Sequence, residues 1–128
     1  MLRYSILHSV YMKREKKDNK GKSPVGLISS DFILGMGDAL NFGKFKYGAH
    51  NWREGIPTDE LFDAAQRHLL KWNKGIDLDD ESNLNHLLHA AVDIMMIYEQ
   101  MMYKPELDTR FKRDYGKANR KKNSKRKD

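Results

Sequence analysis

The sequence predicts an all-α domain with three principal helices, arranged as a helical bundle that is completed by oligomerisation. The first observation is that apolar residues recur at a spacing of three and four positions in three segments between residues 29 and 103. The second is that cap and stop residues bound these segments. The third is that the last segment is apolar almost all round, as in a helix buried on several sides. Because three helices of this size make a thin core, we expect a second copy of the chain to cover this last helix.

The first predicted helix follows the sequence Pro-Val-Gly at residues 24–26 and ends at Gly48. Ser29 or Ser30 is placed to cap it, with Asp31 in its first turn. Asp31 and Asp38 are seven residues apart on a second face, either as solvated carboxylates or as ligands for a cation. The predicted buried stripe consists of Phe32, Ile33, Met36, Ala39, Leu40, Gly43 and Tyr47.

The loop at residues 49–57 is rich in groups that bind ligands, because it reads Ala-His-Asn-Trp-Arg-Glu-Gly-Ile-Pro. Trp52 can equally fill a gap in the core.

The second predicted helix runs from Asp59 to about residue 74, capped by Thr58 and stopped by Gly75. His68 lies within its apolar face, which consists of Leu61, Phe62, Ala65, Leu69 and Trp72.

The third predicted helix, within residues 82–103, carries the polar groups that we expect to matter for function. His86, His89 and Asp93 fall at positions i, i+3 and i+7 on one side. Burying such groups unpaired costs several kcal/mol, so their partners come from other helices or from a ligand. Two interpretations stay open: core histidines satisfied by backbone carbonyls and by each other, or groups with proton or metal chemistry. The roughly opposite side is the predicted core stripe, Leu84, Leu87, Leu88, Ala91, Met95, Tyr98 and Met102.

Charge divides the 128 residues into three parts, whose boundaries we place at 1–23, 24–104 and 105–128. The net charge is +5 over residues 1–22, −6 over residues 23–103 and +7 over residues 104–128. We therefore expect an N-terminal arm with a basic loop, an acidic folded domain and a mobile basic tail.

The sequence has no cysteine and no run of eighteen apolar residues. We therefore expect no membrane span and a reducing, cytoplasmic location.

Three ordered motifs resemble the phage-associated dATP/dGTP diphosphohydrolase family. They are Lys-Tyr-Gly-Ala-His-Asn-Trp-Arg-Glu-Gly at 46–55, Asp-Ala-Ala-Gln-Arg-His-Leu-Leu-Lys-Trp at 63–72, and Asp-Asp-Glu-Ser-Asn-Leu-Asn-His-Leu-Leu-His-Ala-Ala at 79–91. The family is similar to the MazG-like all-α nucleoside triphosphate pyrophosphatases. The resemblance, which covers roughly residues 24–103, implies hydrolysis of a (deoxy)nucleoside triphosphate to monophosphate and pyrophosphate. It also implies Mg²⁺, or Mn²⁺, held by carboxylates on helices, since oxygen ligands suit a hard cation.

The resemblance also implies roles for individual residues. Asp31 stands where a family Glu is expected, and Leu34 stands where a second carboxylate often lies. The implied metal ligands are Asp31, Asp38, Glu81 and Asp93. The implied catalytic groups are Glu81, Asp93, His86 and His89, with the histidines as metal ligands, proton carriers or groups that orient other ligands. The implied nucleotide-binding residues are Lys46, Arg53 and Arg67 for phosphate, Tyr47, Trp52 and Trp72 for stacking on a base, and Asn51 and His68.

Two other functions stay open. Because Leu34 cannot bind a metal, the chain can instead be a protein that binds and sequesters a nucleotide or a nucleotide-derived signal without turnover, as a phage counter-defence protein would. The basic ends can attach to nucleic acid through electrostatic attraction, although no DNA- or RNA-binding motif accompanies their charge.

Overall fold

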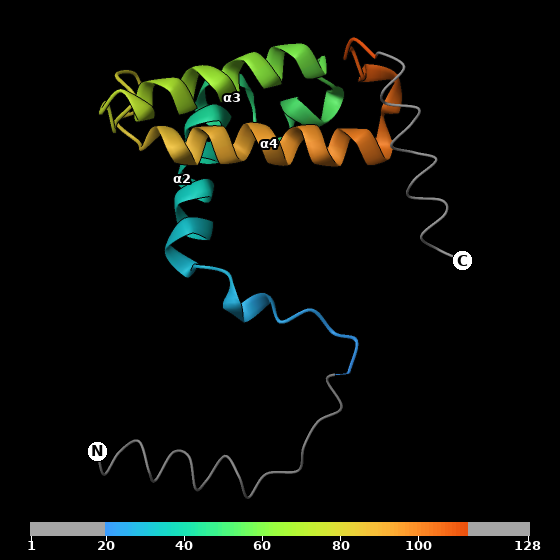
Figure 1. The fold of residues 1–128 in the computed structure, drawn as a ribbon, viewed down its shortest axis with the longest axis horizontal. Coiled ribbons are helices and arrows are strands. Elements are labelled where there is room, and N and C mark those ends of the chain that lie inside the picture. The colour runs from blue at the N-terminus through green and yellow to red at the C-terminus, as the bar shows by residue number, and fades with distance from the viewer. Residues whose placement is uncertain (1–19, 113–128) are drawn as a thin grey trace, which may run out of the picture.

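Three α-helices follow one another in residues 20–112, the part of the chain that this computed structural model describes (Figure 1). They are α2 (Ser30–Tyr47), α3 (Thr58–Asn73) and α4 (His86–Tyr103). Single 3-10 turns lie at η1 (Val25–Leu27), η2 (Asn51–Glu54) and η3 (Pro105–Leu107). The described residues form no β-strand beyond an isolated bridge between Leu78 and Asn85. The predicted all-α class is therefore confirmed.

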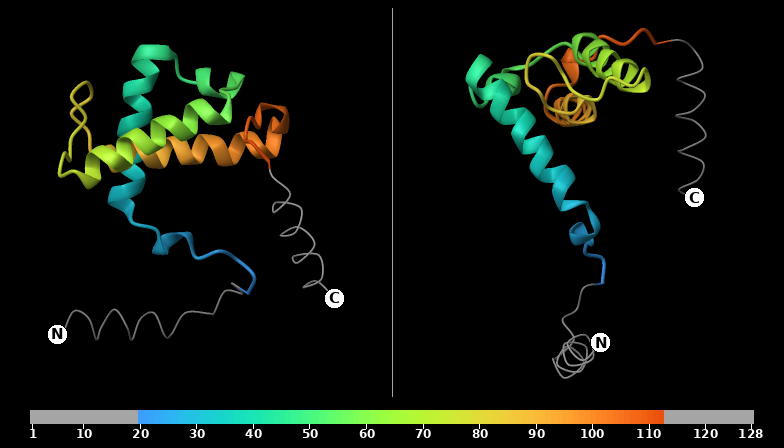
Figure 2. Two further views of the ribbon diagram at one scale, coloured as in Figure 1. Left: turned by 45° about the horizontal axis from the view of Figure 1, so that its top comes forward. Right: turned by 90° about the vertical axis from the view of Figure 1, so that its left-hand side faces the viewer.

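α3 and α4 lie side by side, and α2 crosses this pair steeply (Figures 1 and 2). Both views of Figure 2 show that the N-terminal half of α2 extends away from the pair. At the crossing, Gly35 of α2 meets Leu88 of α4 so closely that a Cβ atom on Gly35 would lie 2.6 Å from Leu88 Cδ2. Because Gly35 has no Cβ atom, α2 and α4 can approach closely at this point.

The ends of α2 are formed by the residues that the sequence indicates. The Ser29 hydroxyl accepts a hydrogen bond from the Phe32 amide at 3.2 Å, which satisfies one of the free donors of the first turn. Gly48 ends the helix with a φ of 96°, a conformation that favours glycine. Both predicted caps are confirmed.

The start of α3 differs from the prediction. Thr58 is the first residue of the helix and Pro57 precedes it, so the Thr58 side chain is no N-cap. Instead Thr109 caps the helix, because its hydroxyl accepts a hydrogen bond from the Asp59 amide at 3.0 Å and donates one to Asp59 Oδ1 at 2.8 Å. The Thr109 amide also donates to Thr58 Oγ1 at 3.0 Å.

Residues 105–109, which we assigned to the tail, thus pack against the helical domain. Leu107 lies against Gly55, whose added Cβ atom would be 2.8 Å from Leu107 Cδ1. The Lys104 ammonium donates to the Glu54 carbonyl at 2.8 Å. Residues 1–19 of the predicted N-terminal arm and the tail beyond residue 112 lie outside the described residues.

The buried apolar core is small and consists of Ala39, Leu61, Ala65, Ala90 and Val92. The prediction that the Leu84-to-Met102 stripe of α4 is core is wrong for its C-terminal half, because Tyr98 is 69% exposed and Met102 is 56% exposed. A helix that is apolar all round offers several equivalent faces, and α3 covers a different one. Among the described residues, no helix is both long and apolar enough to cross a bilayer.

Candidate functional site

A pocket with a volume of about 700 Å³ lies between α2, η2, α3 and α4, with the loop at residues 74–85 at one end. Its lining combines three kinds of side chain. The carboxylates are Glu60, Asp63, Asp79, Glu81 and Asp93; the cations are Lys44, Lys46 and Arg67; the aromatic rings include Phe42, Tyr47 and Trp52. Such a mixture suits a ligand that has both an aromatic part and several charges.

Lys46 and Glu81 form an ion pair at the pocket, with Lys46 Nζ 2.6 Å from Glu81 Oε1. The hydrogen bond to Glu81 raises the pKa of Lys46 above its ordinary value. The Lys46 ammonium also lies 5.3 Å from the centre of the Tyr47 ring. Because both charged side chains are substantially exposed, the pair adds little to folding stability, and both groups are available to a ligand.

Asp93 has the most unusual surroundings in the pocket. Its Oδ2 atom is buried without a hydrogen-bond partner in the described chain. Burial raises the pKa of Asp93 to about 6, although the charge of Arg67 opposes this change. A buried, unpaired carboxylate that faces a pocket is typical of a site that receives a proton, a cation or a polar ligand.

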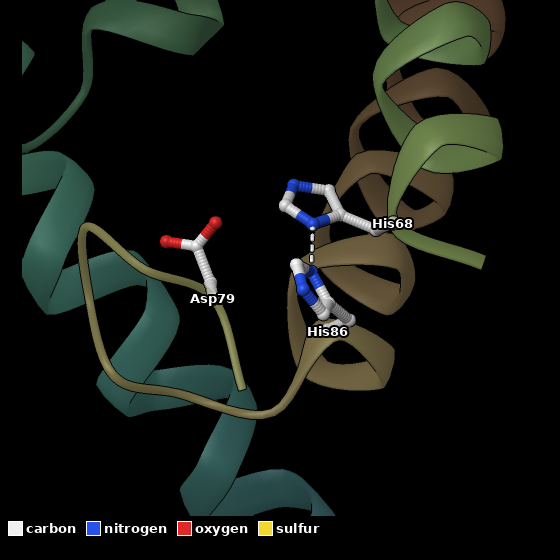
Figure 3. A group of neighbouring side chains, drawn as sticks. All are labelled: His68, Asp79 and His86. Carbon is white, nitrogen blue, oxygen red and sulfur yellow. Dashed lines mark hydrogen bonds between the residues drawn. The ribbon is translucent and has the colours of Figure 1, made fainter. Parts of the chain in front are cut away.

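Three histidines meet where α3 faces the start of α4. His68 Nδ1 and His86 Nδ1 share a hydrogen bond of 2.8 Å (Figure 3), and the His68 and His89 rings are stacked with their centres 4.8 Å apart. His86 is only 1% exposed. Burial, followed by the neighbouring His89 and His86, lowers the pKa of His68 to about 4, and burial also lowers the pKa of His89. His68 is therefore neutral at pH 7.

The loop before α4 brings Asp79 and Ser82 to the same cluster. Asp79 Oδ2 accepts hydrogen bonds from the Glu81 amide, the Ser82 amide and the Ser82 hydroxyl. Burial alone would raise the pKa of Asp79, but these hydrogen bonds, led by those from Ser82, hold it below its ordinary value. Since the Ser82 hydroxyl proton goes to Asp79, its contact with His89 Nε2 at 2.7 Å requires His89 to be the donor.

Asp79 and Ser82 are two residues of the histidine cluster that sequence reasoning missed as site candidates. The available signal was the Asp-x-x-Ser spacing just before a helix, which favours a turn in which the carboxylate accepts backbone hydrogen bonds. The loop is held in shape by its own backbone. The Asp79 amide donates to the Leu84 carbonyl, and the His86 amide donates to the Asp77 carbonyl, each at 2.8 Å.

The structure brings most of the proposed site residues to this pocket and leaves others elsewhere. Those that line it are Lys46, Tyr47, Asn51, Trp52, Arg67, His68, Glu81, His89 and Asp93. His86 lies next to His68 and is buried. Arg53 stacks on Trp52 with its guanidinium 4.5 Å from the ring centre and pairs with Glu99 at 3.1 Å, outside the pocket. Trp72, Asp31 and Asp38 are exposed and do not line it.

Comparison with known protein families shows to which family this chain belongs. The family described as "dATP/dGTP diphosphohydrolase, N-terminal" matches residues 12–110 of this chain. The chain belongs to this family. A relative in Salmonella phage PMBT28, named dATP/dGTP diphosphohydrolase, is 38% identical over 94 residues. That alignment covers 73% of this chain and 32% of the relative, so the chain spans about a third of the relative's length. No solved structure matches the chain significantly.

All pocket residues of this dATP/dGTP diphosphohydrolase family member lie within the matched range. The pocket contains carboxylates that can bind a hard cation, cations that can bind phosphate oxygens and rings that can stack on a base. It also contains a neutral imidazole, His89, whose Nε2–H is committed to Ser82. The pocket therefore offers groups that can contact a ligand with an aromatic part, several negative charges and a bound cation.

Proposed function

We propose that this chain binds a deoxynucleoside triphosphate, dATP or dGTP, in the pocket between α2, α3 and α4 and hydrolyses it to the monophosphate and pyrophosphate. The observation that supports this most directly is the gathering of Glu81, Asp93, Lys46, Arg67 and Tyr47 around one pocket. The choice of purine deoxynucleotides rests on the name of the phage relative, dATP/dGTP diphosphohydrolase.

The cationic and aromatic groups divide the pocket into two parts in this proposal. Lys46 and Arg67 bind the phosphates, where Arg67 offers two parallel donors. Tyr47 and Trp52 stack on the base, and Asn51 hydrogen-bonds to its edge. When phosphate oxygens replace Glu81 as the partner of Lys46, the Glu81 carboxylate is released toward a cation.

The pocket offers carboxylate oxygens to a divalent cation. Asp93 Oδ2 is buried and lacks a hydrogen-bond partner in the described chain, and Glu81 is an oxygen donor in the same pocket. We propose that Glu81 and Asp93 hold Mg²⁺ or Mn²⁺, which when bound neutralises charge on the phosphates and lowers the pKa of water. Asp31 and Asp38 are exposed on α2 away from the pocket, so the proposal does not depend on them.

The chemical step needs a proton acceptor near the pocket, and we assign this role to His89. Because its Nε2–H is donated to Ser82, its Nδ1 carries a free lone pair in the neutral ring. In this proposal a water oxygen bonds to the α-phosphorus while the bond from that phosphorus to the bridging oxygen breaks. Pyrophosphate leaves with the bridging oxygen, and the water proton passes to His89 and then to solvent. His68, which is hydrogen-bonded to His86, stacks on the ring of His89 and holds it in place.

We also propose that the chain forms a homo-oligomer through the N-terminal half of α2. This half extends away from α3 and α4 (Figure 2), and its large apolar residues are open to solvent in the single chain. Phe32 is 41% exposed, Ile33 50% and Leu34 68%. Burying such a surface against a second copy is favourable, at roughly 25 cal/mol per Å² of apolar area.

A single assay tests the enzymatic proposal. The full chain is incubated with each of the four dNTPs and Mg²⁺ or Mn²⁺, and released pyrophosphate is measured, with calorimetry on the same nucleotides. We expect pyrophosphate from dATP or dGTP, and a loss of at least about 100-fold in kcat in Glu81→Gln and Asp93→Asn, because the cation loses a ligand. Asp80→Asn, which changes an exposed neighbour outside the pocket, should leave the rate unchanged.

The same assay distinguishes the alternative functions. Tight, saturable nucleotide binding without pyrophosphate release would overturn the enzymatic proposal in favour of a sequestering protein. Wild-type rates in both Glu81→Gln and Asp93→Asn would remove these two residues from the site. Neither nucleotide binding nor turnover, with duplex DNA binding that falls steeply with salt, would favour attachment to nucleic acid through the basic ends.

A further inference from the structure

We propose that His68, His86 and Asp79 form a binding site for a transition-metal ion, with Zn²⁺ as the best fit, separate from the hard-cation site assigned to Glu81 and Asp93. One ligand atom from each of these three residues lies within 4.8 Å of the other two. Figure 3 shows the two imidazoles together, with the Asp79 carboxylate beside them on the loop. The proposal does not depend on nucleotide hydrolysis.

The three ligands come from separate segments that the fold brings together. His68 lies near the end of α3, Asp79 lies in the connecting loop and His86 is the first residue of α4. The backbone hydrogen bond from the His86 amide to the Asp77 carbonyl, 2.8 Å long, fixes the loop against the helix start. The loop contacts therefore hold Asp79 near the two imidazoles, with the three ligand atoms within 4.8 Å of one another, and the carboxylate closes the remaining distance when a metal binds.

The distance between the two imidazoles is close to what one metal ion requires. His68 Nδ1 and His86 Nδ1 are 2.8 Å apart and share one proton. With Zn–N bonds of about 2.0–2.1 Å in a tetrahedral site, two nitrogen ligands stand roughly 3.3 Å apart. Replacing the shared proton by a metal ion thus needs the two rings to separate by only about half an ångström.

The donor types select the class of metal. Imidazole nitrogens suit Zn²⁺, Co²⁺, Ni²⁺ and Fe²⁺, whereas Mg²⁺ prefers an all-oxygen, near-octahedral shell. Two imidazoles and one carboxylate leave a fourth position for water or for a ligand that enters from the pocket. A hard cation would be better placed at Glu81 and Asp93, which offer only oxygen.

Surrounding groups hold Asp79 in the orientation of a ligand. In the described part of the chain, the hydrogen bonds that its carboxylate accepts all end on Oδ2, from Glu81 and Ser82, so Oδ1 keeps its lone pairs for a metal. Ser82 is in turn bound by His89 at 2.7 Å, and His89 stacks on His68. Such outer partners are a regular feature of metal sites, and their loss typically costs about 10–100-fold in affinity.

The test uses the full chain, stripped of metal with a chelator, and two probes. Calorimetry with Zn²⁺ measures affinity and stoichiometry, and the visible absorption of Co²⁺ reports nitrogen ligation and tetrahedral geometry. We expect one equivalent of Zn²⁺ per chain and an intense Co²⁺ band, both retained in excess Mg²⁺. Zn²⁺ should also raise the unfolding temperature, because binding to the folded state stabilises it.

Variants locate the site. His68→Gln and Asp79→Asn should each weaken Zn²⁺ binding by about 100-fold or more, beyond the range for an outer partner. Ser82→Ala should weaken it by about 10-fold. His50→Ala is the matched control, since His50 is exposed and bonded to Arg53 away from the cluster. Circular dichroism of each variant, recorded without metal, separates lost ligation from lost folding.

Three results would overturn the proposal. They are the absence of saturable Zn²⁺ binding to the wild type, unchanged binding in His68→Gln and Asp79→Asn, and an octahedral Co²⁺ spectrum. Pyrophosphate release with Mg²⁺ is measured in parallel on the same metal-free samples. Normal turnover without Zn²⁺ binding would contradict only the metal site, and Zn²⁺ binding without turnover would contradict only the proposed hydrolysis.

Discussion

At the scale of single residues, Asp93 is a carboxylate whose ionised form is unfavourable in the folded chain. Its Oδ2 is buried without a partner in the described chain, and its pKa is raised to about 6 by burial, against the opposing charge of Arg67. An unpaired buried carboxylate weakens a fold. Its presence at the pocket is explained if a ligand supplies the missing partner.

This burial makes stability depend on pH. The folded chain holds the Asp93 proton more tightly than the unfolded chain, in which the pKa is near 3.8. The stabilisation from this group is therefore complete below about pH 4 and is lost as the pH rises through about 6. We predict that Asp93→Asn, which cannot ionise, unfolds at a higher temperature than the wild type at about pH 8, with a smaller difference at about pH 4.

Thermal unfolding followed by circular dichroism at the two pH values checks this prediction. The same variant should lose turnover, so stability and activity change in opposite directions. Asp80→Asn serves as the control, because Asp80 is exposed. An Asp93→Asn protein that unfolds at the wild-type temperature at both pH values would contradict the account of a desolvated carboxylate.

At the scale of elements, the start of α3 depends on a residue far along the chain. Thr109 satisfies the Asp59 amide and holds the Asp59 carboxylate. We predict that Thr109→Val lowers the free energy of unfolding by about 1 kcal/mol, the usual cost of losing an N-cap. Thr109→Ser, which keeps the hydroxyl, should stay close to the wild type. Urea unfolding measures both, and equal stability of the Val and wild-type proteins would show that the cap is not needed.

The same element shows what a sequence can predict and what it cannot. Ser29 and Gly48 were predicted as the ends of α2 because each acts on backbone within three or four positions. The Thr109 cap was not predictable, since it joins residues 50 positions apart. Thr58 has the right chemistry at the right place, yet it became the first helical residue rather than the cap.

The sequence predicted only part of the core and only part of the site, because the remaining contacts depend on how distant segments pack. α4 is apolar all round, so its periodicity did not determine which face would meet α3, and Tyr98 and Met102 remain exposed. His86, His89 and Asp93 were recognised because polar residues stand out on such a helix. Asp79 was missed because its role comes from the loop geometry, which three hydrogen bonds to Oδ2 define.

At the scale of the whole molecule, the exposed half of α2 indicates that one chain is incomplete. We predict that the full chain elutes as an oligomer, at twice its 15.0 kDa mass or more, and that Leu34→Asp shifts it toward the monomer. Leu70→Asp is the matched control, because Leu70 of α3 has a similar exposure, 58% against 68% for Leu34. Size-exclusion chromatography with light scattering gives the masses. A wild-type monomer would contradict the predicted oligomer, and an unshifted Leu34→Asp mass would place the interface elsewhere.

The account depends on one pocket that receives both a triphosphate and a cation. The most direct measurement is a crystal structure of the full chain with Mn²⁺ and a dATP analogue whose α,β-bridge is an imido group, with anomalous scattering to locate the metal. We predict phosphates between Lys46 and Arg67, and a manganese peak at Glu81 and Asp93. Phosphates bound at another surface, with Asp93 still buried and without a partner, would contradict the central claim.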